Sequence, residues 1–196
     1  MTSVLSRPMV KRIGSRSGIV LLLFIVAACA TAAPVMREDT FVPENWKVLA
    51  VLPFTGNTVF GKPAGEFFAF QLQKQTRFRV IAPAAVELTL NRAGVRLPDG
   101  NVTVERSQTL ARLVPADAVF VGSVTLRPFL GAVANVTLID VATGRVVATA
   151  VQDSAGAANY RVDVHARVTV AVERVGAQLK TALEESSKKP LGANFR

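Results

Sequence analysis

The stretch that decides the fold is KVLAVLPF at residues 47–54, a nearly continuous apolar run closed by Pro53. A strand with one buried face alternates between apolar and polar residues, whereas a strand buried on both faces is apolar at almost every position. The run therefore predicts a central strand of a sheet that is covered on both sides.

Helical and extended patterns alternate downstream of this run. Helices are predicted from Pro63 to Gln75, from Pro83 to near Gly94 and over residues 107–114, with a short strand at residues 78–82 between the first two. Proline suits the first turn of a helix, because its missing N–H would have no partner there. Glu66 is expected to stabilise the positive end of the first helix.

Three strands in succession are predicted next, at residues 118–126 (AVFVGSVTL), 134–141 (ANVTLIDV) and 145–151 (RVVATAV). The last two are joined by the turn 142–144, which ends in glycine, so they form an antiparallel hairpin. Apolar residues at helical spacing then predict a long helix over residues 162–186.

The predicted order is β-α-β-α-α-β-β-β-α. Parallel strands need crossover helices, whereas adjacent strands joined by short turns are antiparallel. The fold class is therefore α/β (α+β), with a mixed sheet of about five strands and helices packed on the sheet.

The N-terminus has the pattern of an export signal. Four basic residues and no acidic residue precede or flank an apolar run at residues 18–28. That run of 11 residues is shorter than the roughly 20 that a membrane-spanning helix needs. Residues 1–28 are therefore predicted to be a signal peptide.

The apolar run ends in Val26-Ala27-Ala28-Cys29, which resembles the lipobox of bacterial lipoproteins. This resemblance implies cleavage between Ala28 and Cys29 and acylation of the Cys29 thiol. Cys29 is the single cysteine in the chain, so it forms no internal disulfide. The alternative is ordinary signal cleavage after Ala28 or Ala33, with no lipid attached.

The remaining chain has the size of one domain. Residues 29–45 are predicted to be a flexible tether, 46–186 the α/β domain and 187–196 a C-terminal tail. The signal peptide holds four of the 23 basic residues and none of the 14 acidic ones, so its removal lowers the formal charge from +9 to +5. The basic residues are scattered and not interleaved with aromatics, which argues against nucleic-acid binding.

The sharpest candidate for enzymatic chemistry is GNTVFGK at residues 56–62, which has the spacing of a phosphate-binding loop. Pro63 stands where a serine or threonine hydroxyl would hold magnesium, and it also removes a backbone donor. An ordinary loop between a strand and a helix is therefore the preferred interpretation, and no cofactor is expected.

The single histidine, His165, falls near the start of the last predicted helix. Its neighbour Asp163 is two residues away, which places the two side chains on different sides of a helix. Asp99, Asp140 and Asp153 each fit a turn or a strand end. No catalytic residue and no metal site is predicted.

Four segments taken in order resemble a superfamily of periplasmic α/β domains. The superfamily includes the curli-secretion lipoprotein CsgG, the penicillin-binding-protein activator LpoB and the N-terminal domain of TolB. The segments are VLAVLPF (48–54), RFRVI (77–81), ADAVFVGSV (116–124) and VTLIDVATGRVV (136–147). CsgG proteins add long membrane-spanning hairpins to this domain, and the 126–133 turn is too short for one.

The resemblance implies a non-enzymatic lipoprotein whose periplasmic domain docks on an envelope protein, in assembly, secretion or activation of peptidoglycan synthesis. Ala30 after the cysteine implies delivery to the outer membrane. The predicted partners are membrane lipid, through Cys29, and an envelope protein, with association into a homo-oligomer left open. The alternatives are a subunit of a CsgG-type secretion channel and a periplasmic enzyme.

Overall fold

The computed structural model describes residues 35–36, 42–43, 45–57, 59–97, 104–127, 131–155 and 163–188. The chain divides into two units, Met1–Thr31 and Ala32–Arg196, and the described residues all belong to the second. The predicted signal peptide, Ala28, Cys29 and residues 189–196 of the predicted tail lie outside the described residues.

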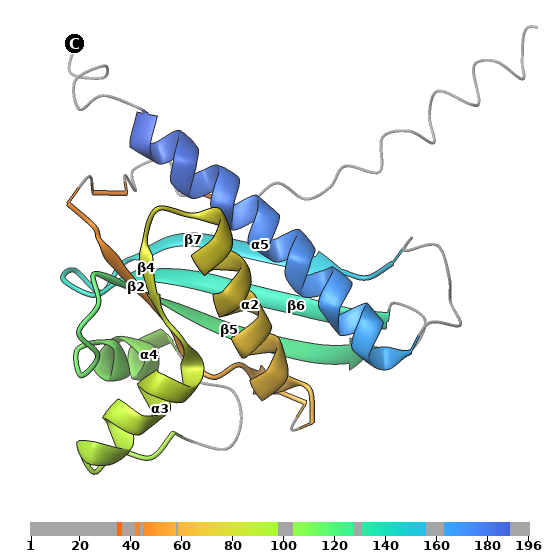
Figure 1. Cartoon of the computed structure of the whole chain (residues 1–196), viewed down its shortest axis with the longest axis horizontal. Helices are drawn as coiled ribbons and strands as arrows, with labels where there is room; N and C mark the ends of the chain where they lie inside the picture. Colours follow the sequence, from red (N-terminus) through yellow and green to blue (C-terminus); the bar gives the residue numbers. More distant parts are fainter. Residues whose placement is uncertain are drawn as a thin grey trace, which may run out of the picture. The chain divides into compact units, whose positions relative to one another are not determined.

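Seven strands form one mixed sheet, in the order β1-β7-β6-β5-β2-β4 with β3 beside β5 (Figure 1). The strands are β1 (Val35–Met36), β2 (Val48–Val51), β3 (Thr55–Gly56), β4 (Arg79–Ile81), β5 (Ala118–Arg127), β6 (Gly131–Asp140) and β7 (Val146–Asp153). The helices are α2 (Gly61–Gln75), α3 (Pro83–Arg92), α4 (Val104–Ala111) and α5 (Val164–Lys188).

The sheet has a parallel part and an antiparallel part. In the parallel part, Leu49 of β2 lies opposite both Val80 of β4 and Ala118 of β5. In the antiparallel part, β5, β6 and β7 form a meander in which Thr137 lies opposite both Val121 and Thr149. The mixed α/β architecture expected from the sequence is confirmed.

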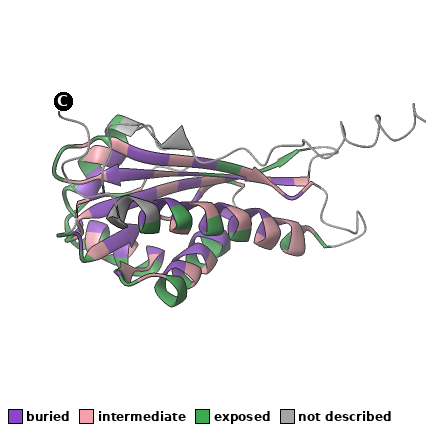
Figure 2. Ribbon diagram, turned by 90° about the horizontal axis from the view of Figure 1, so that it is seen from above, coloured by how far each residue is buried: buried purple, intermediate pink, exposed green. Residues whose placement is uncertain are grey.

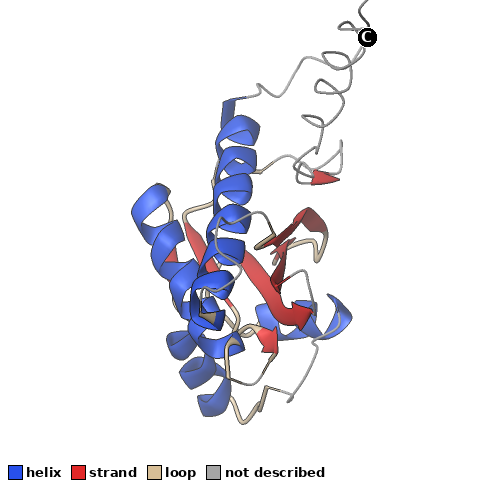
Figure 3. Cartoon of the chain, turned by 90° about the vertical axis from the view of Figure 1, so that its right-hand side faces the viewer, coloured by secondary structure: helices blue, strands red, loops and turns tan. Residues whose placement is uncertain are grey.

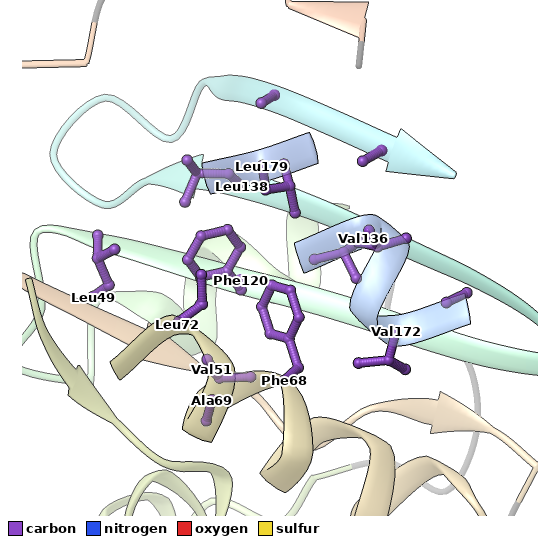
Figure 4. Close-up of a cluster of buried hydrophobic side chains, with 14 of the residues drawn as sticks. Leu49, Val51, Phe68, Ala69, Leu72, Phe120, Val136, Leu138, Val172 and Leu179 are labelled. Carbon is purple, nitrogen blue, oxygen red and sulfur yellow. The ribbon is translucent and has the colours of Figure 1, made fainter. Parts of the chain in front are cut away.

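The two faces of β2 are buried in two different clusters, because successive side chains of a strand point to opposite faces. Leu49 and Val51 pack in the larger cluster, whose helical members come from α2 and α5 (Figure 4). Ala50 and Leu52 pack in the smaller cluster, with side chains from α3 and α4. Figure 3 shows helices on both sides of the strands. The double burial explains why residues 47–54 are almost continuously apolar.

Phe68 of α2 is fully buried at the centre of the larger cluster (Figure 4). Its ring centroid lies 5.4 Å from that of Phe54 and 5.2 Å from that of Phe120, with a T-shaped arrangement in the second pair. Burial of one such side chain stabilises the fold by about 1.5–3 kcal/mol. These three rings therefore join α2 to β5 and to the segment after β2.

The start of α3 is capped from another helix. Ala82, which precedes α3, has no side-chain oxygen to accept a bond from the first turn. Instead, Glu66 of α2 accepts a hydrogen bond from the backbone N–H of Ala84 at 2.8 Å. The expectation that Glu66 stabilises the start of its own helix was wrong, because α2 begins at Gly61 and Glu66 lies beyond its first turn.

The early start of α2 depends on Gly61. A Cβ at this position would lie 2.5 Å from the carbonyl oxygen of Phe54, so the absence of a side chain allows the helix to begin close to the end of β2. The predicted loop at residues 56–62 is shorter in the structure, because Gly56 belongs to β3, which pairs with β5, and Gly61 and Lys62 belong to α2.

Two parts of the predicted tether, residues 29–45, pack on the domain. Val35 and Met36 form β1 and pair with β7 in antiparallel orientation. Val42 is 1% exposed and belongs to the larger cluster. This stretch is therefore attached to the domain by the backbone pairing of β1 with β7 and by the burial of Val42 in the core.

Candidate docking surface

One face of the antiparallel meander is open. Eight side chains of β5, β6 and β7 point away from α2 and α5, as the pairing register and the alternation of side chains require. We call this set the open face; its members are Val121, Ser123, Thr125, Val133, Asn135, Thr137, Thr149 and Val151. Each is intermediate or exposed, and the strands in Figure 2 alternate between buried and less buried residues.

Asp153 and Arg127 lie at one margin of the same side of the sheet, opposite Val133 and Gly131, whereas the open face itself carries no ionisable side chain. It consists of three valines, three threonines, a serine and an asparagine. Val151 is 47% exposed, although valine is usually buried. The hydroxyls of Thr137 and Thr149 lie 3.3 Å apart, within hydrogen-bond distance across two strands. Covering this surface with a partner would therefore remove apolar area from water without burying a charge.

The open face results from how far α3 and α4 extend across the sheet. Their cluster includes Val119 at the start of β5 and reaches Val121, but it contains no side chain from β6 or β7 among the described residues. At the same end of the meander, α4 contacts the β6–β7 turn through a hydrogen bond from Gln108 to the carbonyl of Gly144. No helix that the structure describes covers the remainder of this face.

The loop with phosphate-loop spacing is closed by its own hydrogen bonds. The side chain of Asn57 accepts bonds from the backbone N–H groups of Val59 and Phe60, at 2.9 and 3.2 Å. Gly61 donates its N–H to the carbonyl of Asn57 at 2.8 Å. These three amides are therefore directed at Asn57, whereas a phosphate site needs them directed at the ligand.

Lys62 points to a neighbouring helix. Its ammonium group lies 3.0 and 3.2 Å from the two carboxylate oxygens of Glu87 on α3. The side chain of Lys62 is 68% exposed, so this ion pair lies at the surface. The arrangement gives Lys62 a role in the α2–α3 contact.

His165 is exposed at the start of α5, and its ring meets that of Phe60 edge to face at a centroid distance of 4.9 Å. Asp163 accepts a hydrogen bond from the backbone N–H of His165 at 3.4 Å, so its carboxylate serves the helix start and does not orient the imidazole. In the described structure, His165 thus makes a packing contact and Asp163 caps a helix. A catalytic pair would instead need a hydrogen bond between the two side chains.

The predicted roles of two aspartates are confirmed. Asp140 accepts bonds from the backbone of Ala142 and Thr143 in the β6–β7 turn. Asp153 accepts a bond from the Ala155 backbone and lies 3.9 Å from the guanidinium of Arg174. Asp99 lies outside the described residues. Within the described ranges, no three His, Cys, Asp or Glu side chains are grouped as metal ligands would be.

The hairpin of β5 and β6 is part of the sheet along its whole length. The two ten-residue strands pair from Ala118–Asp140 to Arg127–Gly131, and three residues connect them. The candidate turn 126–133 therefore lies mostly within paired strand. Among the residues that the structure describes, no helix is long and apolar enough to cross a membrane.

The sequence analysis did not identify the open face as a site. A signal for it exists, since the positions between buried residues in strands 118–126, 134–141 and 145–151 hold Val, Ser, Thr and Asn without a charge. The solvated face of an antiparallel sheet usually alternates polar residues with the buried ones, so valines at these positions, without any charge over three adjacent strands, were the detectable feature.

No family model matches the sequence, and no curated protein matches it. Several solved structures are similar to it. The LpoB C-terminal domain from Escherichia coli is 16% identical, with a TM-score of 0.42 over 59% of this chain and 84% of that one. A PelC dodecamer from Paraburkholderia phytofirmans is 24% identical, with a TM-score of 0.45 over 74% and 97%. Lipoprotein GNA1162 from Neisseria meningitidis is 18% identical, with a TM-score of 0.43 over 69% and 99%.

Proposed function

We propose that this chain is a non-enzymatic outer-membrane lipoprotein of the CsgG/LpoB/TolB type, whose periplasmic domain docks on an envelope protein through the open face. The observation that carries the docking role is the uncharged surface of eight side chains on three adjacent strands. The observation that supports the lipid anchor is the sequence Val26-Ala27-Ala28-Cys29 after a short apolar run. Assembly, secretion and activation of peptidoglycan synthesis are the processes that such a protein would serve.

The physical case for docking rests on the cost of burial. Burying a surface of Val, Thr, Ser and Asn costs little free energy, because its hydroxyl and amide groups can form hydrogen bonds with a partner. No charge on this surface needs a compensating charge. The surfaces of α2 and α5 offer a contrast, since they carry exposed lysine and glutamate residues such as Lys62 and Glu184. The open face is therefore the part of the described surface best suited to a protein interface.

Docking is preferred to a secretion channel because the meander has no spare hairpin. A membrane-spanning hairpin needs two strands of about 9–11 residues that leave the domain. The β5 and β6 strands are long enough, but β5 also pairs with β2 and β3, and β6 also pairs with β7. Insertion into a membrane would break these pairings.

The test is site-specific photo-crosslinking of the full, lipidated protein in intact envelopes, with the crosslinking amino acid at Asn135. We expect a discrete crosslinked product. The substitution Val151→Glu should abolish it, because residue 151 lies directly opposite residue 135 and a charge there would have to be buried at the interface. Val151 is half exposed, so this change should leave folding intact.

The matched control is Thr181→Glu, which adds the same charge to the exposed surface of α5. It should leave the product from position 135 unchanged. Docking through the open face would be disproved if Val151→Glu left the product intact, or if Thr181→Glu removed it equally well. A crosslinker placed at position 181 should give no product that depends on residue 151.

A further inference from the structure

Five exposed basic side chains gather at one end of the sheet, the end at which β2, β4 and β7 begin (Figure 1). Two of them come from the end of α2 and the loop that follows it, and three lie at the starts of these strands. We call this set the basic end; its members are Lys47, Lys74, Arg77, Arg79 and Arg145. They are scattered in the sequence, and the fold brings them together.

Backbone contacts establish a continuous row across this end. The N–H of Arg79 donates to the carbonyl of Lys47 at 2.9 Å. The carboxylate of Asp117, which precedes β5, accepts a hydrogen bond from the Lys47 backbone at 2.7 Å. The start of β5 pairs beside Asp140 of β6, whose N–H donates to the carbonyl of Arg145 at 2.9 Å. Four strand spacings of about 4.8 Å make the row from β4 to β7 about 19 Å wide.

The positive charge of the basic end is not matched by nearby carboxylates. The two carboxylates in the row are directed at backbone N–H groups, since Asp117 bonds to the start of β2 and Asp140 to the β6–β7 turn. None of the five basic side chains forms an ion pair with a carboxylate of the described residues. The formal charge of the row is +3, or +2 when Glu44, which lies outside the described residues, is counted.

An exposed aromatic ring lies among these cations. Phe70, one helical turn before Lys74, is 50% exposed, and the Lys74 ammonium group lies 4.2 Å from its ring centroid. The guanidinium of Arg77 lies 5.3 Å from the ring centroid of Phe78, which is buried. The basic end therefore offers an accessible apolar ring beside cations, a combination that can place carbon atoms at a headgroup boundary and charge beside phosphate.

We propose that the basic end binds an anionic lipid surface, with Phe70 at the headgroup boundary. Each basic residue near an anionic membrane strengthens binding about fivefold. Lipid fits better than a protein partner, because lysine is depleted at protein interfaces, whereas a headgroup surface supplies many mobile anions. The strands would stand upright on the membrane, which leaves the open face accessible from the side. The proposal depends neither on acylation of Cys29 nor on docking through the open face.

Vesicle sedimentation tests the proposal with residues 30–196, which need no lipid anchor. This fragment contains the unit Ala32–Arg196, and hence all described strands and helices and both buried clusters. Vesicles of phosphatidylethanolamine with phosphatidylglycerol should bind it about tenfold more tightly than vesicles of phosphatidylcholine, and salt should weaken the binding. Lys74→Gln combined with Arg77→Gln should lower the affinity at least about tenfold. Phe70→Ser should lower it several-fold.

The matched control removes two positive charges at the opposite end of the sheet, as Lys62→Gln with Arg127→Gln. Lys62 is already paired with Glu87, and Arg127 ends β5. This double variant should lower the affinity by less than about twofold, because screening confines the effect of a charge to its surroundings. Equal losses in the two double variants would overturn the proposal, as would equal binding to the two kinds of vesicle. Cooperative urea unfolding of each variant confirms that it is folded.

The orientation is tested with a fluorophore at one of two exposed positions near opposite ends of α2, Gln73→Cys or Val59→Cys. Residues 30–196 contain no other cysteine. Lipids with a quencher in the headgroup region should quench the label at position 73 several-fold more than the label at position 59. Equal quenching, or the reverse order, would refute the orientation.

An acidic protein as the occupant would give a different result. A photo-crosslinker at Gln73 in intact envelopes would then yield a protein product that depends on Lys74 and Arg77, while the vesicles would show no preference for phosphatidylglycerol. That outcome would overturn the lipid proposal. We expect the preference for phosphatidylglycerol and no such protein product.

Discussion

The ring of Phe54 occupies the space that a side chain at Gly122 would need. A Cβ at position 122 would lie 2.4 Å from Cε1 of Phe54. On the same face of β5, Phe120 and Val124 are fully buried, so Gly122 forms a gap between them that Phe54 fills. The glycine in the sequence VGSV is thus explained by contact with a residue 68 positions earlier in the chain.

We expect Gly122→Ala to lower the free energy of unfolding by about 1–3 kcal/mol, because the added methyl group overpacks the core against Phe54. The measurement is urea denaturation of residues 30–196 produced without the anchor. The control is Gly176→Ala in α5, where the nearest atom to a new Cβ lies 3.9 Å away. That change should raise stability by about 0.5–1 kcal/mol, because glycine is unfavourable within a helix. A loss of stability in the control, or none in Gly122→Ala, would contradict the account of this gap.

Asp117 links the start of β2 to β5 through one carboxylate oxygen, which accepts bonds from the backbone N–H groups of Lys47 and Val48 at 2.7 and 2.8 Å. Asp117→Ala should lower the free energy of unfolding by about 1.5–3 kcal/mol, since both amides lose a charged acceptor. Asp117→Asn should cost less than Asp117→Ala, because one amide oxygen can still accept both bonds. Thermal unfolding of the three proteins checks the order, and equal losses in the two variants would contradict it.

Lys62→Ala should change the free energy of unfolding by no more than about 0.5 kcal/mol, because the Lys62–Glu87 ion pair is at the surface and screened by water. We also expect no saturable ATP or GTP binding by calorimetry in the parent protein. Micromolar nucleotide binding that disappears in Lys62→Ala would restore the phosphate-loop hypothesis. Glu87→Gln serves as the control, since it removes the ion pair and keeps the lysine.

Cys29→Ser should abolish incorporation of labelled palmitate and prevent lipoprotein processing, because the acylation step needs a thiol. The substituted protein should no longer fractionate with the outer membrane. Ala33→Ser is the matched control, since it introduces the same hydroxyl four residues later and should leave labelling intact. Palmitate in the Cys29→Ser protein would show that the lipobox prediction is wrong.

The order of helices and strands was predictable because it depends on local patterns. Residues 47–54 are apolar at both faces, and the structure buries both faces. The prolines at positions 63 and 83 lie in the first turns of α2 and α3. The turns at Asp140 and Asp153 were predictable for the same reason, because the aspartate bonds to backbone only two or three residues away.

Contacts between residues distant in sequence were decided by the tertiary structure. From the sequence, Glu66 was expected to stabilise the start of its own helix. The packing of α2 beside α3 makes it the cap of α3 instead. The attachment of Val35 and Met36 to β7 also requires the completed sheet edge, because two residues carry too short a pattern to predict a strand.

The features of the candidate site also fall into those that the sequence predicts and those that only the tertiary structure decides. From adjacent residues, the sequence determined the α/β fold class and the unsuitability of Pro63 in a phosphate loop, and its resemblance to a lipobox predicts acylation at Cys29. Only the tertiary structure placed eight uncharged side chains of β5, β6 and β7 on one open face. Which face of a strand stays open depends on how far the helices of another segment reach across the sheet. Among the described residues, the apolar cluster of α3 and α4 includes side chains of β5 and none of β6 or β7.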